Sequence, residues 1–127
     1  MLSKLNAIKA MLLLSSLVVV FHLLIVAGVI PYQVVWAGRL NTTRDMYEFE
    51  AVSILVNLLL IRVLLLKKKH NNARKWVNWV LYLFIALFVL NTLGNLTAKT
   101  NFERWVFTPL TLLCVLLLFV IVAPRKA

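Results

Sequence analysis

Residues 10–30 read AMLLLSSLVVVFHLLIVAGVI, a run of 21 residues without a charged side chain. At about 1.5 Å per residue, a helix of this length is about 30 Å long, which matches the hydrocarbon core of a bilayer. Residues 76–98 and 105–124 form two further charge-free runs of similar length, and residues 46–66 form a fourth apolar stretch with three charged side chains. The sequence therefore predicts four transmembrane helices.

The composition also indicates a membrane protein. Apolar residues make up 63% of the 127 residues, and the mean hydropathy is +0.94, which is too high for a soluble fold of this size. A net charge of +10 would suggest nucleic-acid binding in a soluble protein, but here we expect the lipid bilayer and no nucleic acid as partner. We predict one transmembrane domain over residues 1–127, with helices at about residues 9–31, 45–66, 75–97 and 101–123.

Basic residues are distributed unevenly between the two ends of these predicted helices. Ten of the 14 Lys and Arg residues fall on one side of a four-helix arrangement, and all four acidic residues fall on the other. Cytoplasmic loops of membrane proteins carry an excess of Lys and Arg, and short connections make sequential helices antiparallel neighbours. We therefore predict an all-α, up-down antiparallel four-helix bundle with both termini in the cytoplasm.

The basic loop KKKHNNARK, residues 67–75, lies on the predicted cytoplasmic side. We interpret it mainly as a topology determinant that also contacts the negative headgroups of the inner leaflet. A specific lipid or protein site in this loop is the alternative interpretation. The expected contacts with anionic lipid headgroups come from Lys67, Lys68, Lys69, Arg74 and Lys75.

Polar side chains recur on one face of the second predicted helix. At 100° per residue, Glu50, Ser53 and Asn57 fall at about 0°, 300° and 340°, which makes a single stripe. Intramembrane ionisable residues commonly mark functional sites. The alternative for Glu50 is a carboxylate that leans outward to the water of the headgroup region.

The first and third helices contain matching polar groups. Asn91 and Asn95 lie four residues apart, beside Gly94 and Ala98, so this face fits either ligand binding or close packing of another helix. His22 fits either a ligand or a structural, hydrogen-bonded histidine.

Counted at 1.5 Å per residue, these groups lie between roughly 5 and 15 Å from the outer helix ends. Such a distribution suits a polar cavity that opens to the outer side and is sealed on the inner side, and a bundle held by buried hydrogen bonds would tolerate it too. The candidate substrate-binding or ion-binding residues are Glu50, Ser53, Asn57, Asn91, Asn95 and His22.

Little in the sequence favours an enzyme. Cys114 is the only cysteine, which excludes an intrachain disulfide and a cysteine-based metal site. We expect no cofactor, no metal and no catalytic residue. A lipid-modifying membrane enzyme that uses His22 with Glu50 or Glu103 as acid and base is the least favoured hypothesis.

Two local features leave alternatives open. Pro109 either kinks the fourth helix or occupies its first turn after Thr108 as N-cap. Asn41 and Asn95 each begin a glycosylation tripeptide, and whether either is ever modified stays open.

Three segments, PYQVVWAGRL (residues 31–40), MYEFEAVSILVN (46–57) and NTLGNLTAKTNFERWVFTPLT (91–111), resemble an uncharacterised family of small bacterial four-helix integral membrane proteins. The resemblance covers nearly the whole chain and implies a multi-pass protein of the bacterial cytoplasmic membrane. It implies no activity, substrate or site residue.

The similar depth of the candidate polar groups in the outer half of the bundle favours small-solute or ion binding and transport by a narrow margin. The alternative function is a non-catalytic interaction or accessory subunit of a membrane complex, either as a homo-oligomer or with another membrane protein.

Overall fold

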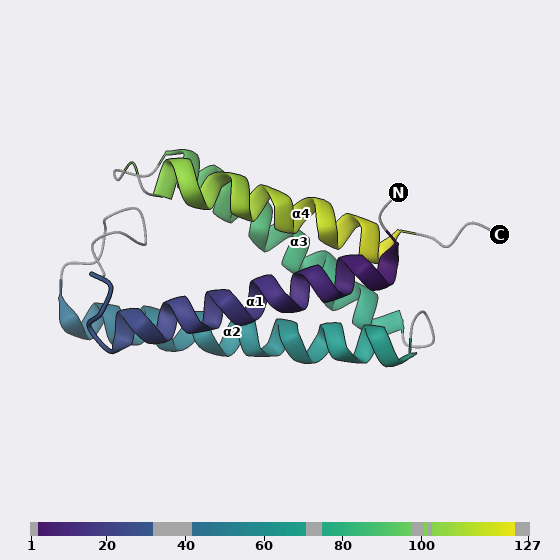
Figure 1. Cartoon of the computed structure of the whole chain (residues 1–127), viewed down its shortest axis with the longest axis horizontal. Coiled ribbons are helices and arrows are strands. Elements are labelled where there is room, and N and C mark those ends of the chain that lie inside the picture. Colours follow the sequence, from purple (N-terminus) through teal and green to yellow (C-terminus); the bar gives the residue numbers. More distant parts are fainter. Residues whose placement is uncertain (1–2, 32–41, 71–74, 98–100, 102, 124–127) are drawn as a thin grey trace.

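A computed structural model describes residues 3–31, 42–70, 75–97, 101 and 103–123 (Figure 1). These residues form the helices α1 (Lys4–Val26), α2 (Thr43–His70), α3 (Lys75–Leu96), the π-helical η4 (Glu103–Phe107) and α4 (Thr108–Val122). With η4 counted together with α4, four helices are long and apolar enough to cross a membrane. No strand occurs in the described ranges. The predictions of an all-α fold and of four helices of transmembrane length are confirmed.

The first helix begins and ends earlier than predicted. The side chain of Ser3 accepts a hydrogen bond from the backbone N–H of Asn6, an N-cap that starts α1 at Lys4 rather than near residue 9. At the other end, Gly28 takes a φ of 83°, a left-handed conformation that favours glycine. The helix therefore ends at Val26, before Pro31 is reached.

The second helix is longer than predicted at both ends. Thr42 Oγ1 accepts a hydrogen bond of 3.0 Å from the backbone N–H of Asp45, so α2 begins at Thr43. Its last turn contains Lys67, Lys68, Lys69 and His70, which were predicted to begin the basic loop. Lysine is a good helix former, and cations in the last turn are stabilised by the helix dipole.

Pro109 lies in the first turn of α4, directly after the π-helical turn η4. Thr108 is not its N-cap, as one alternative held: the N-cap position is Phe107, which has no side-chain cap hydrogen bond. Phe107 has helical backbone angles, φ −78° and ψ −31°, so the backbone continues from η4 into α4.

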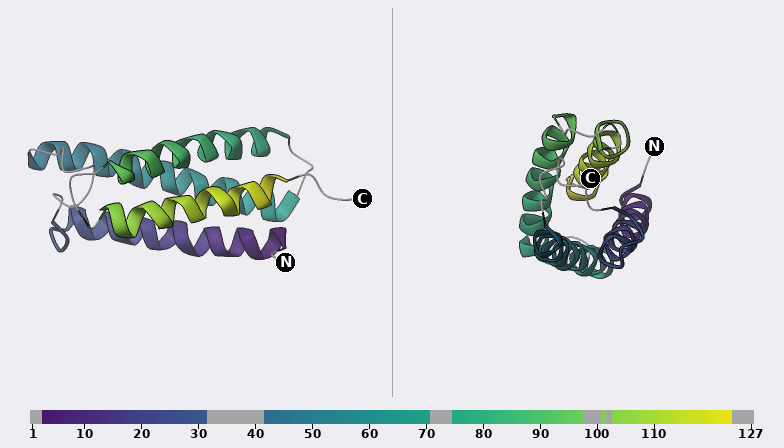
Figure 2. Two further views of the ribbon diagram at one scale, coloured as in Figure 1. Left: turned by 90° about the horizontal axis from the view of Figure 1, so that it is seen from above. Right: turned by 90° about the vertical axis from the view of Figure 1, so that its left-hand side faces the viewer.

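The helices pack mainly in two pairs, α1 with α2 and α3 with α4, which are joined chiefly by contacts of α1 with α4 (Figure 2). One end of the molecule, here called the basic end, contains the starts of α1 and α3 and the ends of α2 and α4 (right-hand side of Figure 1). The opposite end, with the end of α1 and the start of α2, is called the acidic end. Its acidic residues are Asp45, Glu48 and Glu50 of α2 and Glu103 of η4.

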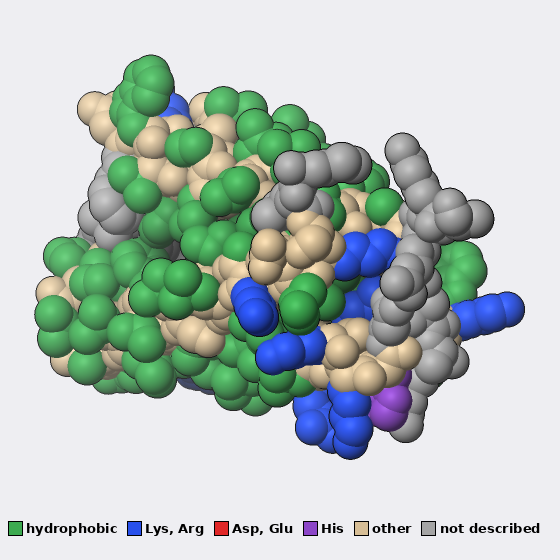
Figure 3. Space-filling view, turned by 45° about the vertical axis from the view of Figure 1, so that its right-hand side comes forward, with side chains coloured by type: hydrophobic (Ala, Val, Ile, Leu, Met, Phe, Trp, Pro, Cys, Tyr) green, Lys and Arg blue, Asp and Glu red, His purple; other side chains and the backbone are tan. Residues whose placement is uncertain are grey.

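The main hydrophobic core occupies the basic half of the molecule. All four helices contribute buried residues to it. Examples are Met11 in α1, Leu64 in α2, Leu81 in α3 and Leu118 in α4. A smaller cluster at the acidic end is formed by Ile25 and Met46, with partly buried residues around them. The outer surface is largely apolar, and Lys and Arg side chains gather at the basic end (Figure 3).

Candidate functional site

His22 and Glu50 meet between α1 and α2 in the acidic half. Nδ1 of His22 contacts Oε2 of Glu50. The Glu50 side chain is fully buried, whereas that of His22 is 14% exposed. The Glu50 carboxylate therefore does not lean outward to water, which was the alternative interpretation of this residue.

Helix geometry explains why these two side chains face each other. Residues three or four positions apart share one face of a helix. Glu50 lies four residues after the buried Met46, and His22 lies three residues before the buried Ile25. Because Ile25 and Met46 pack together, the next turn inward brings the imidazole to the carboxylate. Aromatic rings flank the pair, since Phe21 packs edge-on against both His22 and Phe107.

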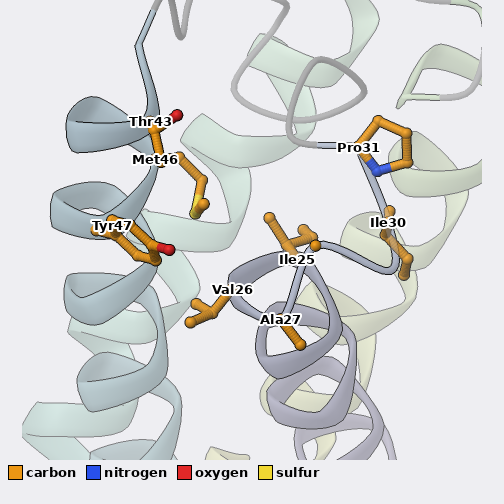
Figure 4. Close-up of a pocket in the computed structure, with 9 residues that line it drawn as sticks. Ile25, Val26, Ala27, Ile30, Pro31, Thr43, Met46 and Tyr47 are labelled. Atoms are coloured by element: carbon orange, nitrogen blue, oxygen red, sulfur yellow. The ribbon is translucent and has the colours of Figure 1, made fainter.

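A cavity of about 420 Å³ lies between α1 and α2 at the acidic end (Figure 4). Its walls include Ile25 and Val26, one turn beyond His22, and Met46 and Tyr47, one turn before Glu50. The remaining lining residues are Ala27, Gly28, Ile30, Pro31 and Thr43. Most of the lining side chains are apolar, Tyr47 and Thr43 add hydroxyl groups, and the cavity lies one turn outward of the His22 and Glu50 pair.

The chemistry of this pair centres on one exchangeable proton. An ionised carboxylate only accepts hydrogen bonds, while a neutral imidazole has one donor and one acceptor nitrogen. The contact can therefore hold Nδ1–H against a carboxylate, or a protonated carboxyl group against Nδ1. The second arrangement has one proton more than the first, and transfer of that proton from the carboxyl group to Nδ1 gives an imidazolium–carboxylate ion pair with the same number of protons. Such pairing is how buried charges are accommodated in membrane proteins.

The other members of the helix 2 stripe bond to their own helix. Ser53 Oγ donates to the carbonyl of Phe49 at 2.9 Å, and Asn57 Nδ2 donates to the carbonyl of Ser53 at 2.8 Å. Both side chains are half-buried. These two hydrogen bonds satisfy local groups and do not connect Ser53 or Asn57 to another helix.

The candidate residues of α3 lie apart from the pair. Asn91 is exposed, Asn95 is half-buried, and a Cβ placed on Gly94 would have no neighbouring atom within 4 Å. Within the described residues, the polar contact between α3 and α4 is made instead by Thr92, whose Oγ1 donates to Thr111 Oγ1 at 2.9 Å. Of the six candidates, the structure therefore brings His22 and Glu50 together, and Asn91 does not meet them.

The basic end contains two lysines that the sequence analysis did not place in the interior. Lys67 is 1% exposed, and its Nζ donates to Oδ1 of Asn78 on α3 at 2.8 Å. The Nζ atom of Lys4 is also buried and has no hydrogen-bond partner among the residues that the structure describes. A signal was present, because Lys67 continues the core spacing of Leu60 and Leu64.

The remaining predicted headgroup contacts differ from Lys67. Lys68, Lys69 and Lys75 are exposed at the basic end, and Arg74 lies outside the described residues, as does Asn41. The part of the chain that the structure describes contains no group of three or more His, Cys, Asp or Glu side chains that could hold a metal ion. Cys114 is buried in α4.

Comparisons with protein-family models, with curated proteins and with solved structures found no match for this chain.

Proposed function

We propose that this chain is a multi-pass protein of the bacterial cytoplasmic membrane that binds and transports a small solute or ion, with the His22 and Glu50 pair as its proton-exchanging site. The observation that carries the proposal is the burial of the Glu50 carboxylate against His22, one turn inward of the cavity. A buried carboxylate at this depth is costly unless it is paired. A transport mechanism that requires proton exchange would explain why the chain has a buried carboxylate at this position.

The proposal includes a topology. The four helices cross the membrane alternately up and down, with the basic end and both termini in the cytoplasm and the acidic end outside. The distribution of Lys and Arg supports this orientation. The exposed Lys68, Lys69 and Lys75 would then lie at the level of anionic headgroups.

The distribution of packing also supports the proposal. The main core fills the basic half of the molecule, while the cavity and the titratable pair lie in the acidic half. A solute or ion that enters from outside would reach His22, which is partly exposed, and would meet a closed apolar core beyond it. Alternating access would require that core to open after the site has been loaded.

The test is flux into proteoliposomes that contain a trapped pH dye, with an imposed pH gradient and with Na⁺, K⁺ and a panel of small solutes outside. We expect Glu50→Gln to lower the rate of proton-coupled flux at least about tenfold, because an amide cannot exchange a proton. Glu48→Gln is the matched control, since Glu48 lies on the same helix with its side chain 61% exposed. Equal flux in both variants, or no flux above protein-free vesicles for the parent protein, would overturn the proposal.

The second candidate function, an accessory or interaction subunit, is favoured by the surface of α3. Asn91 and the open side of Gly94 both face outward, where a helix of another protein or of a second copy would satisfy the amide. Cys114 is too buried for crosslinking. The test is therefore disulfide crosslinking in membranes with Gly94→Cys in a Cys114→Ala background, and with Leu83→Cys, which is 71% exposed on the same helix, as control.

A further inference from the structure

Two lysine side chains from different helices turn inward at the basic end. Lys4 lies in the first turn of α1 and Lys67 in the last turn of α2. Lys4 lies one turn before Ala7 and Ile8 of α1, and Lys67 lies one turn after Val63 and Leu64 of α2. These four residues belong to one buried cluster, so both lysines lie at the same edge of that cluster. Two ammonium groups that are withdrawn from water and placed near one another are unfavourable unless an anion joins them.

The chain supplies no acidic side chain to this end. Its four acidic residues occupy positions 45, 48, 50 and 103, all at the acidic end. Along α2, Lys67 lies 17 residues beyond Glu50, which corresponds to about 25 Å. One hydrogen-bond acceptor of Lys67 is Asn78 Oδ1 on α3, which is a neutral amide. Neutralisation of Lys4 by an acidic side chain of the chain is therefore not available.

We infer that Lys4, Lys67 and Asn78 form a binding site for one phosphate group at the basic end. The Lys4 Nζ atom, buried and without a hydrogen-bond partner among the described residues, is the donor that the phosphate would satisfy. A phosphate offers several acceptor oxygens to the donors of two ammonium groups, and the amide nitrogen of Asn78 is a further donor. The phosphate belongs either to the headgroup of an anionic lipid or to free phosphate.

The surroundings favour the approach of such an anion. Lys9, Lys68, Lys69 and Lys75 are exposed around the same end, and Figure 3 shows this concentration of positive side chains. They raise the local concentration of anions without themselves being buried. This inference does not depend on the proposed transport function, because it concerns the end of the molecule opposite His22 and Glu50.

Native mass spectrometry of the full chain in a non-ionic detergent tests the site, with phosphatidylglycerol and phosphatidylcholine added in equal amounts. We expect one retained phosphatidylglycerol, preferred about tenfold over phosphatidylcholine, in line with charge-assisted hydrogen bonds to a buried site. In Lys4→Met, the preference for phosphatidylglycerol over phosphatidylcholine should fall to the level that exposed lysines alone provide. Lys9→Met is the matched control, because it removes the same charge from an exposed position of α1 and should change the preference less than about twofold.

A second variant keeps the test decisive if Lys4→Met fails to fold. Asn78→Asp has nearly the same shape and places a carboxylate beside Lys67, so it should occupy the role of the phosphate. We expect this variant to lose the retained lipid and to have a higher melting temperature than the parent protein in lipid-free detergent.

A third arm distinguishes the two sources of phosphate. If inorganic phosphate, but not phosphatidylglycerol, raises the melting temperature of the parent protein and not of Lys4→Met, the site binds free phosphate. Equal lipid retention by the parent, Lys4→Met and Lys9→Met, together with no effect of inorganic phosphate, would overturn the inference. So would full retention of phosphatidylglycerol by Asn78→Asp.

Discussion

Nδ1 of His22 on α1 contacts the carboxylate of Glu50 on α2, outside the main hydrophobic core. The contact links the first helix pair in the half of the molecule where apolar packing is limited to the cluster around Ile25 and Met46. It therefore combines two roles that experiments can separate, the joining of two helices and the exchange of a proton.

The structural role predicts strong coupling between these two positions. Glu50→Leu alone leaves the imidazole of His22 without its carboxylate, and we expect the free energy of unfolding to fall by about 1–3 kcal/mol. His22→Leu combined with Glu50→Leu should lie within about 1 kcal/mol of the parent protein, because an apolar pair of similar volume replaces the buried polar one. Unfolding in mixed micelles, analysed as a double-mutant cycle, measures the coupling. Additive effects of the two substitutions would contradict it.

Substitution of Lys67 and substitution of Asn78, its hydrogen-bond partner at the basic end, should have unequal costs. We expect Asn78→Leu to lower the free energy of unfolding by about 1–3 kcal/mol, because the buried Lys67 ammonium loses the acceptor that it contacts. Lys67→Met should be less costly, since it removes the buried charge together with its need for a partner. Lys68→Met controls for charge removal from an exposed position of the same turn. The order is checked by thermal unfolding, and a larger loss for Lys67→Met than for Asn78→Leu would refute it.

The hydrogen bond between Thr92 and Thr111 is the described polar link of α3 to α4. The Thr111 hydroxyl donates its proton to the carbonyl of Phe107, and the single proton of Thr92 is shared between Thr111 Oγ1 and the carbonyl of Phe88. Because local acceptors remain, we expect Thr92→Val to cost only about 0.6 kcal/mol, typical of interhelical hydrogen bonds in membranes. A cycle with Thr111→Val measures the interaction, and a coupling above about 2 kcal/mol would show a larger role than this.

Two glycines should respond in opposite ways to the same substitution. Gly94 is helical, and a Cβ there meets no atom, so Gly94→Ala should raise the free energy of unfolding by about 0.5–1 kcal/mol. Gly28 has a φ of 83°, so Gly28→Ala should lower it by about 1–2 kcal/mol through backbone strain. Thermal unfolding of the monomer in detergent compares the two. Destabilisation by Gly94→Ala in membranes, but not in the monomer, would instead indicate a partner at α3.

The apolar runs alone were sufficient to predict four helices of transmembrane length, because the bilayer fixes both the length and the composition of such segments. The helix ends were less predictable. Ser3 and Thr42 extend α1 and α2 through side-chain caps, and residues 67–70 remain helical although their charges suggested a loop. The π-helical turn before Pro109 was not predicted, since no residue in that stretch requires it.

The sequence could predict which helix face carries the candidate residues, but not which helix lies opposite that face. The helical period placed Glu50 on a polar face, but it could not show that α1, rather than α3, lies opposite that face. His22 was paired with Glu50 or Glu103 only in the least favoured hypothesis, and Asn91 was a further candidate for the same polar cavity. Lys67 was misplaced for a different reason: its charge suggested the surface, whereas its spacing from Leu60 and Leu64 assigned it to the interior.

The placement of the main core has a mechanical consequence. The ribbons of the α1–α2 pair and the α3–α4 pair diverge toward the acidic end, where Phe21 and Phe107 form an aromatic contact between them (Figure 1). With the tight packing at the far end acting as a pivot, a rotation of one pair by about 10° would displace its acidic end by about 4 Å over a lever arm of about 25 Å. Buried packing is thus concentrated at one end of the molecule, and only a small cluster joins the helices at the other.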